Sequence, residues 1–157
     1  RADDPLLTSR GRRDPEPLRV VLSRGLDLPA KAQLWDTGSA ATLVAHGPEA
    51  AGKPAPNGPE RLELDQCEPL PLMQHLAARG CNQVLWECGP ELAAAAIRQG
   101  CVQEVAAVLA PKLMGGTAAR TPLGKLGFTA MDQVLSGEWQ PPLPIGDDWL
   151  LSLRLGG

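Results

Sequence analysis

The stretch Val84-Leu85-Trp86-Glu87-Cys88-Gly89-Pro90-Glu91-Leu92-Ala93-Ala94-Ala95 says most about the fold of this chain. Its apolar start predicts a buried strand at residues 83–86. The alanine-rich continuation predicts a helix at residues 90–99 that ends at Gly100. Proline suits the first helical position, because its missing N–H would have no partner there. A strand that turns directly into a helix is typical of an α/β protein.

The turn at Gly89 and Pro90 predicts a site for an anion. Gly89 leaves room for a ligand near the backbone, and the free N–H groups of the first helical turn favour negative charge. In a parallel sheet such a turn lies at the carboxyl end of a strand, where ligands bind in open α/β folds. A phosphate or pyrophosphate is therefore expected, with Glu87 placed to accept hydrogen bonds from a ligand. The alternative is an ordinary turn with a solvated glutamate, since the G-x-G-x-x-G fingerprint is absent.

Before and after this stretch, the sequence contains several short apolar runs and one more segment with helical periodicity. Strands are predicted at residues 18–23, 41–45, 62–64, 104–110 and 149–155, a helix at 70–79, and loops at 52–59 and 141–144. Strands that alternate with helices predict a mostly parallel sheet flanked by helices. We therefore expect one α/β domain over residues 1–157.

The composition excludes several functions. Lysine and arginine number 15 against 18 aspartates and glutamates, so the net charge of −3 argues against a nucleic-acid or anionic-membrane binder. No apolar run approaches the ~20 residues needed to cross a bilayer. The four cysteines form no C-x-x-C pair, so no metal site is expected, and reduced thiols in a cytoplasmic protein are the better interpretation. Because the first residue is Arg1 rather than methionine, we expect a piece of a longer polypeptide.

Four segments of the chain, in the same order, resemble the reductase domain of the bifunctional riboflavin-biosynthesis deaminase/reductase. They are residues 2–10 (ADDPLLTSR), 18–22 (LRVVL), 85–90 (LWECGP) and 110–116 (APKLMGG). The resemblance implies a dihydrofolate-reductase-like fold. It also implies that NADPH reduces 5-amino-6-(5-phosphoribosylamino)uracil to 5-amino-6-(5-phosphoribitylamino)uracil. Its further implications are a homodimer and an N-terminal zinc deaminase domain in the parent chain, which these residues do not contain.

The resemblance also assigns roles to residues at matching positions. Leu7, Arg10 and Glu87 would bind the substrate, and the Arg10 guanidinium would form a bidentate, charge-assisted contact with its phosphate. Asp3 would lie near the nicotinamide nucleotide. At the position where the family has a small polar residue that contacts NADPH, this chain has Arg24, and we expect its guanidinium to meet the 2′-phosphate and so favour NADPH over NADH. The cofactor phosphates would be held by Gly89, Pro90, Glu91, Leu92, Ala93, Ala94 and Ala95. No catalytic side chain is assigned.

Three alternatives stay open at the level of sequence. One is a stand-alone reductase of the same superfamily that acts on a diaminopyrimidinone. Another is a noncatalytic domain that supports dimerisation. The third is a different phosphate-binding protein that uses only the helix end at Gly89 and Pro90. Because further contacts of the family precede the first matching segment, we expect the 157 residues to be inactive or nearly so by themselves.

Overall fold

A computed structural model describes residues 4–113, 115 and 121–156. Contacts within the chain group it into two compact units, Arg1–Leu76 and Ala77–Gly157. Each unit is described by itself, and the single domain over residues 1–157 stays a prediction. Among the described residues, no helix is both long enough and apolar enough to span a membrane.

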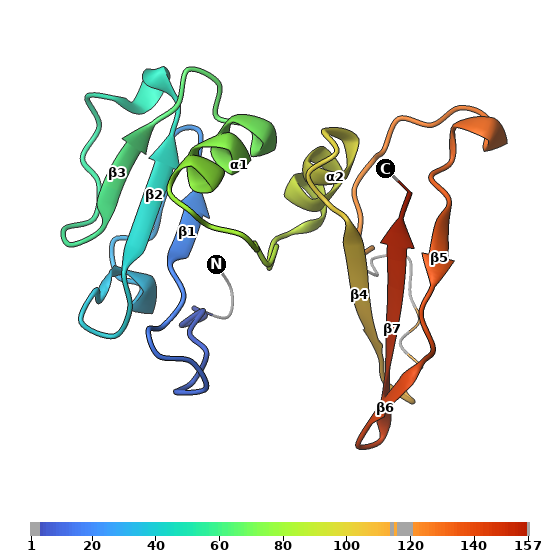
Figure 1. The fold of residues 1–157 in the computed structure, drawn as a ribbon. Helices are drawn as coiled ribbons and strands as arrows, with labels where there is room; N and C mark the ends of the chain where they lie inside the picture. The colour runs from blue at the N-terminus through green and yellow to red at the C-terminus, as the bar shows by residue number, and fades with distance from the viewer. Residues whose placement is uncertain (1–3, 114, 116–120, 157) are drawn as a thin grey trace. The chain divides into compact units, whose positions relative to one another are not determined.

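The first unit is built on a parallel sheet of three strands in the order β1-β2-β3 (Figure 1). The strands are β1 (Arg19–Leu22), β2 (Thr42–His46) and β3 (Glu60–Glu63). The central strand β2 is buried along its whole length, as expected of a parallel strand with both faces covered. All three predicted strands of this unit are confirmed, and β3 is an edge strand, because β2 is its one partner among the described strands.

The core of this unit includes Val44 of the central strand β2. Leu26, Val44 and Ala50 form a buried cluster. Short 3₁₀ helices at Gln33–Trp35 and Pro48–Ala50 connect the strands. The predicted helix is confirmed as α1 (Pro69–Ala78), whose last two residues fall in the second unit. Its buried residues Pro69, Leu72 and Leu76 recur at helical spacing, so one stripe of α1 is apolar and packed.

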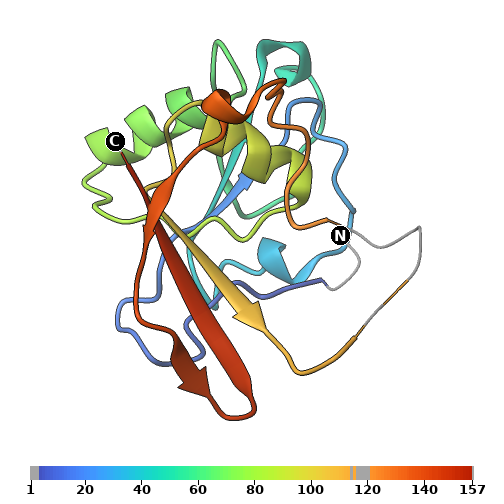
Figure 2. The same ribbon diagram turned by 90° about the vertical axis from the view of Figure 1, so that its right-hand side faces the viewer.

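The described part of the second unit is built on an antiparallel sheet and the helix α2 (Figure 2). Its elements are α2 (Pro90–Arg98), β4 (Glu104–Leu109), a 3₁₀ helix (Met131–Gln133), β5 (Gly137–Trp139), β6 (Leu143–Ile145) and β7 (Asp148–Leu155). β7 pairs with β4 along one edge and with β5 and β6 along the other. β6 and β7 are joined by the two residues Gly146 and Asp147, and Gly146 has the positive φ of +60° that such a tight hairpin requires.

The mostly parallel sheet predicted from the sequence is therefore only partly correct. The first sheet is parallel, whereas every strand pair of the second sheet is antiparallel. The reason lies in the connections: short links such as the one between β6 and β7 join only antiparallel neighbours, and parallel neighbours need a long crossover.

Two local predictions are wrong. No strand forms at residues 83–86, because these residues make no ladder with any described strand, and Leu85 is 77% exposed. The turn at Gly89 therefore does not follow a strand of a parallel sheet. The Pro-rich stretch at 141–144, predicted to be a loop, contributes Leu143 and Pro144 to β6. Proline is tolerated there because, among the described strands, β6 pairs with β7 alone and is an edge strand.

Candidate functional site

The start of α2 is open and uncapped, as the sequence predicts. Gly89 is the N-cap residue with extended backbone (φ −72°, ψ 167°), and no side chain caps the helix. A Cβ added at Gly89 would meet no described heavy atom within 4 Å. The first-turn N–H groups have no partner within the helix, so they are available to a ligand together with the positive end of the helix dipole.

The segment at Gly124 packs directly on this helix start, which sequence reasoning did not find. The Gly124 amide donates to the Pro90 carbonyl over 2.9 Å, and Arg98 Nη1 donates to the Lys125 carbonyl over 2.6 Å. A Cβ at position 124 would lie only 2.8 Å from Glu91 Oε1. A larger residue at this position would require the Glu91 carboxylate to move. In the sequence, Gly124 is a lone glycine in a stretch without apolar periodicity. Such a glycine does not indicate which segment packs against it.

The helix start has small buried side chains behind it and exposed polar ones before it. Ala94 is fully buried, whereas Ala93 and Ala95 are half-buried. Glu87 is exposed and has no hydrogen-bond or ion-pair partner among the described residues. Its carboxylate is therefore free to accept hydrogen bonds from a ligand.

The thiols of the chain are free, and most of them are shielded. Cys88 is half-buried one residue before Gly89, and burial raises the pKa of its thiol. Burial is also the main cause that raises the pKa values of Cys67 and Cys101. Among the described residues, no group of histidine, cysteine and carboxylate side chains is arranged to hold a metal ion.

In the first unit, the two predicted substrate residues lie in one loop with unusual backbone. Leu7 has a φ of +49° and Arg10 a φ of +54°, in the left-handed region that side chains other than glycine rarely adopt. Leu7 is half-buried and Arg10 is exposed. The Arg10 guanidinium has no partner within the described part of the chain, so it can pair with a ligand phosphate.

Arg24 follows β1 and is already paired with a carboxylate. Its Nη2 donates to Glu68 Oε1 over 2.7 Å, and 68% of the Arg24 side chain remains exposed. An exposed pair of this kind is held weakly, so an incoming phosphate can compete with Glu68 for the guanidinium.

The predicted site residues thus divide between the two units. Leu7, Arg10 and Arg24 belong to the first, and Glu87 and residues 89–95 to the second. Asp3 lies outside the described residues, as do Met114 and Gly116 of the APKLMGG segment.

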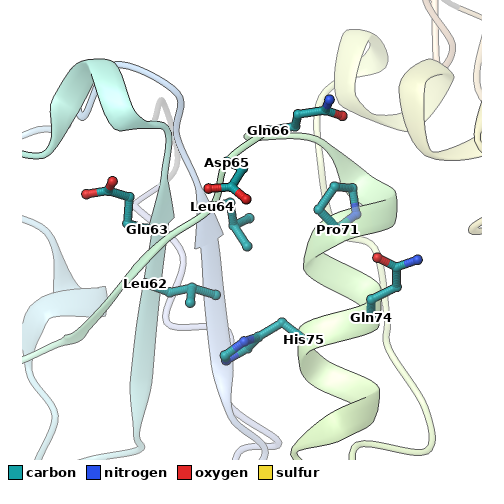
Figure 3. A pocket seen from close by; sticks show the side chains of 8 residues that line it. All are labelled: Leu62, Glu63, Leu64, Asp65, Gln66, Pro71, Gln74 and His75. Atoms are coloured by element: carbon teal, nitrogen blue, oxygen red, sulfur yellow. The ribbon is translucent and has the colours of Figure 1, made fainter.

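The first unit also contains a concavity of about 420 Å³ beside β3 and α1 (Figure 3). Leu62, Leu64, Asp65 and His75 are among the residues that line it, and none of the predicted site residues does. Nε2 of His75 is buried and has no hydrogen-bond partner among the described residues. The sequence analysis did not identify this concavity.

The two units define an α/β protein, in which α2 has an open, uncapped start and the exposed Glu87 before it has no partner among the described residues. Comparison with known proteins then identifies the family. A family model described as RibD C-terminal domain matches residues 1–141, and the chain belongs to this family. The resemblance to the riboflavin-biosynthesis reductase is thereby confirmed.

Individual relatives agree with this assignment. The chain is 49% identical over 162 residues to the riboflavin biosynthesis protein RibD of Synechocystis, covering 100% of this chain and 44% of the relative. It is 40% identical over 140 residues to the chloroplastic riboflavin biosynthesis protein PYRR of Arabidopsis thaliana, covering 87% and 23% respectively. The structure of Acinetobacter baumannii RibD matches with a TM-score of 0.78 at 27% identity, over 99% of this chain and 44% of that one. The chain therefore spans less than half the length of these relatives.

Proposed function

We propose that this chain is the reductase part of a riboflavin-biosynthesis enzyme. The reaction is the NADPH-dependent reduction of 5-amino-6-(5-phosphoribosylamino)uracil to 5-amino-6-(5-phosphoribitylamino)uracil. The observation that carries the proposal is the open, uncapped start of α2 in a chain that belongs to the RibD C-terminal domain family.

The residues at this helix start fit the phosphates of a dinucleotide. Gly89 leaves open space at its Cβ position, and the first-turn amides are uncapped. The one acidic group of the first turn, Glu91, has its carboxylate against Gly124. NADPH supplies the hydride when it is bound. In the proposal, residues 89–95 form the phosphate site, and the N–H groups of the first helical turn that have no partner within the helix bind the phosphates.

The remaining site residues contact the substrate, the nicotinamide nucleotide and the 2′-phosphate of NADPH. Arg10 pairs with the substrate phosphate, Leu7 provides an apolar contact, and Glu87 accepts hydrogen bonds from the pyrimidine. Asp3 lies near the nicotinamide nucleotide. Arg24 selects NADPH by exchanging Glu68 for the 2′-phosphate. The role of the protein is thus orientation and charge, because the hydride chemistry belongs to the cofactor.

The proposal includes the assembly and setting that the resemblance implies. We propose a homodimer and a zinc deaminase domain elsewhere in the polypeptide, in keeping with the greater length of the relatives. We also propose a cytoplasmic location. The 157 residues taken alone are expected to turn over slowly or not at all.

The test is an assay of the protein that contains these residues. With NADPH and the phosphoribosylamino-uracil, we expect loss of NADPH absorbance and a product that has gained two hydrogen atoms in mass spectrometry. Turnover only with a diaminopyrimidinone would favour the stand-alone reductase. Absence of NADPH binding at millimolar concentration would instead leave the noncatalytic domain. Binding of inorganic phosphate without preference for a nicotinamide nucleotide would favour the simple phosphate binder.

A further inference from the structure

We propose that Glu16 is a positioning residue, which holds the backbone on both sides of Arg10 and so presents the Arg10 guanidinium to the substrate phosphate. The inference deepens the proposed function and rests on it. It concerns the loop formed by residues 4–11, here called loop 4–11.

Loop 4–11 has an unfavourable backbone that needs outside support. Asp4, Leu7 and Arg10 all have positive φ, at 40°, 49° and 54°. None of them is glycine, so each pays a steric cost that persists only where the surroundings impose it. Two of these three residues are the predicted substrate contacts. The unfavourable backbone therefore coincides with two of the residues that the proposed function places at the substrate.

Glu16 supplies the support around Arg10. Its Oε2 accepts a hydrogen bond from the Ser9 amide over 2.6 Å, and its Oε1 accepts from the Gly11 amide over 3.0 Å and the Ser9 hydroxyl over 2.9 Å. The two amides belong to the residues immediately before and after Arg10. The Ser9 amide and then the Gly11 amide lower the pKa of Glu16, so it is a carboxylate at neutral pH.

A second anchor holds the other end of the loop. Arg19 of β1 is only 2% exposed, and its guanidinium has no carboxylate partner among the described residues. Nη1 donates to the Leu6 carbonyl over 3.3 Å, and Nη2 donates to the carbonyls of Asp36 and Ala40 over 2.7 and 2.6 Å. The peptide before Leu7 is thereby tied to the sheet. A third tie joins Gln33 to Asp4, whose Oδ1 accepts from the Gln33 amide over 3.0 Å.

The Arg10 side chain is the part of this arrangement that stays free. Its backbone is fixed on both sides, while the guanidinium is exposed and has no partner among the described residues. Fixing the backbone in advance lowers the ordering cost when a phosphate binds, which improves affinity without a new contact. Glu16 therefore acts on the substrate through Arg10 and does not touch it.

The experiment compares Glu16→Gln with Asp14→Asn in the full protein. Both changes remove one negative charge from the same segment, but Asp14 is exposed and makes no hydrogen bond or ion pair among the described residues. We expect Glu16→Gln to raise the KM for the phosphoribosyl substrate about fivefold or more, because a charged hydrogen-bond network is lost, with kcat changed less than about twofold. Asp14→Asn should change neither value.

A double-mutant cycle shows whether Glu16 acts through Arg10. In an Arg10→Ala background, Glu16→Gln should raise the KM no further, since the group it positions is gone. Trypsin gives a readout that needs no reductase activity: cleavage after Arg10 should be faster in Glu16→Gln than in Asp14→Asn. Melting temperatures and circular dichroism check that each variant is folded.

Each outcome decides the matter. Coupled KM effects with faster cleavage support the inference. A wild-type protein that turns over normally, with an unchanged KM in Glu16→Gln or with additive effects of the two substitutions, overturns it and leaves the proposed function standing. A wild-type protein without turnover overturns the proposed function, and the inference about the substrate falls with it, whatever trypsin shows.

Discussion

At the scale of single residues, the chemistry of the chain depends on how each charge is paired. Arg24 forms an ion pair with Glu68, whereas Arg10 and Glu87 have no partner among the described residues. Unpaired, exposed charges contribute little to stability, and they are available to a ligand of opposite charge. Arg10 and Glu87 can therefore meet a ligand directly, whereas Arg24 must first exchange Glu68 for the ligand.

Replacing Arg24 tests the proposed preference for NADPH. Arg24→Ala should reduce the ratio of NADPH to NADH affinity about tenfold, because a charge-assisted hydrogen bond to the 2′-phosphate contributes about 1.5–3 kcal/mol. Competitive titration of both nucleotides measures the ratio. An unchanged ratio would assign Arg24 to the Glu68 pair alone.

The pKa shifts of the thiols predict their reactivity. Because burial raises the pKa values of Cys67, Cys88 and Cys101, less thiolate is present at neutral pH than in a free cysteine. Alkylation by iodoacetamide should be at least about twofold slower than for a free cysteine at pH 7, and it should accelerate as the pH rises. Peptide mapping by mass spectrometry follows each site, with urea-unfolded protein as the control. Labelling of folded and unfolded protein at equal rates would contradict the prediction.

At the scale of elements, the start of α2 is the feature that links the fold to the ligand. Its conformation is a local consequence of glycine, proline and the alanine run, and the segment at Gly124 then packs against it. The helix is nine residues long and uncapped, so the N–H groups of its first turn depend on solvent or a ligand for partners.

Gly89→Val is expected to abolish nucleotide binding while the fold persists. The φ of −72° suits valine and the Cβ position is open, so stability should change by no more than about 0.5 kcal/mol. Access to the first-turn amides would be blocked, and NADPH affinity should fall about tenfold or more. Calorimetric titration measures the affinity. Gly52→Val, also in open space, is the matched control and should bind normally. Equal affinities of the two variants would place the cofactor elsewhere.

At the scale of the whole chain, apolar exposure is uneven. Of the described large apolar side chains that are exposed, only Leu6 and Leu70 lie in the first unit. The sheet of the second unit exposes Val108 and Trp139 at 63% each, and the paired residues Leu109 and Trp149. By the strand register, Leu109, Trp149 and Trp139 lie on one face of this sheet, and Val108 lies on the other. Exposed apolar side chains that share a face are typical of an interaction surface, which supports the homodimer that we propose.

Leu109→Glu tests this dimer. A carboxylate at an apolar contact costs free energy, and in a symmetric dimer it would be introduced twice. The dissociation constant from sedimentation velocity should rise about tenfold or more. Leu113→Glu changes a fully exposed leucine outside the sheet and should leave the constant unchanged. A wild-type protein that stays monomeric at high micromolar concentration would refute the homodimer.

The amino-acid sequence by itself determined the elements whose causes are local. Proline at the first position, the alanine run and Gly100 specify α2, and uninterrupted apolar residues specify β2 and β4. The family could also be identified from short ordered segments, as could the open turn at Gly89. These signals lie within a few neighbouring residues, so no knowledge of distant contacts is needed.

Only the tertiary structure decided which segments are partners. Residues 83–86 have the composition of a strand but no described neighbour to pair with, whereas β5 and β6 are strands because β7 pairs with them. Likewise, nothing near Glu16 or Arg19 in the sequence shows that they hold the loop containing Leu7 and Arg10. A strand and an anchored loop are both made by hydrogen bonds to residues outside the segment itself, and the pattern within the segment does not encode those bonds.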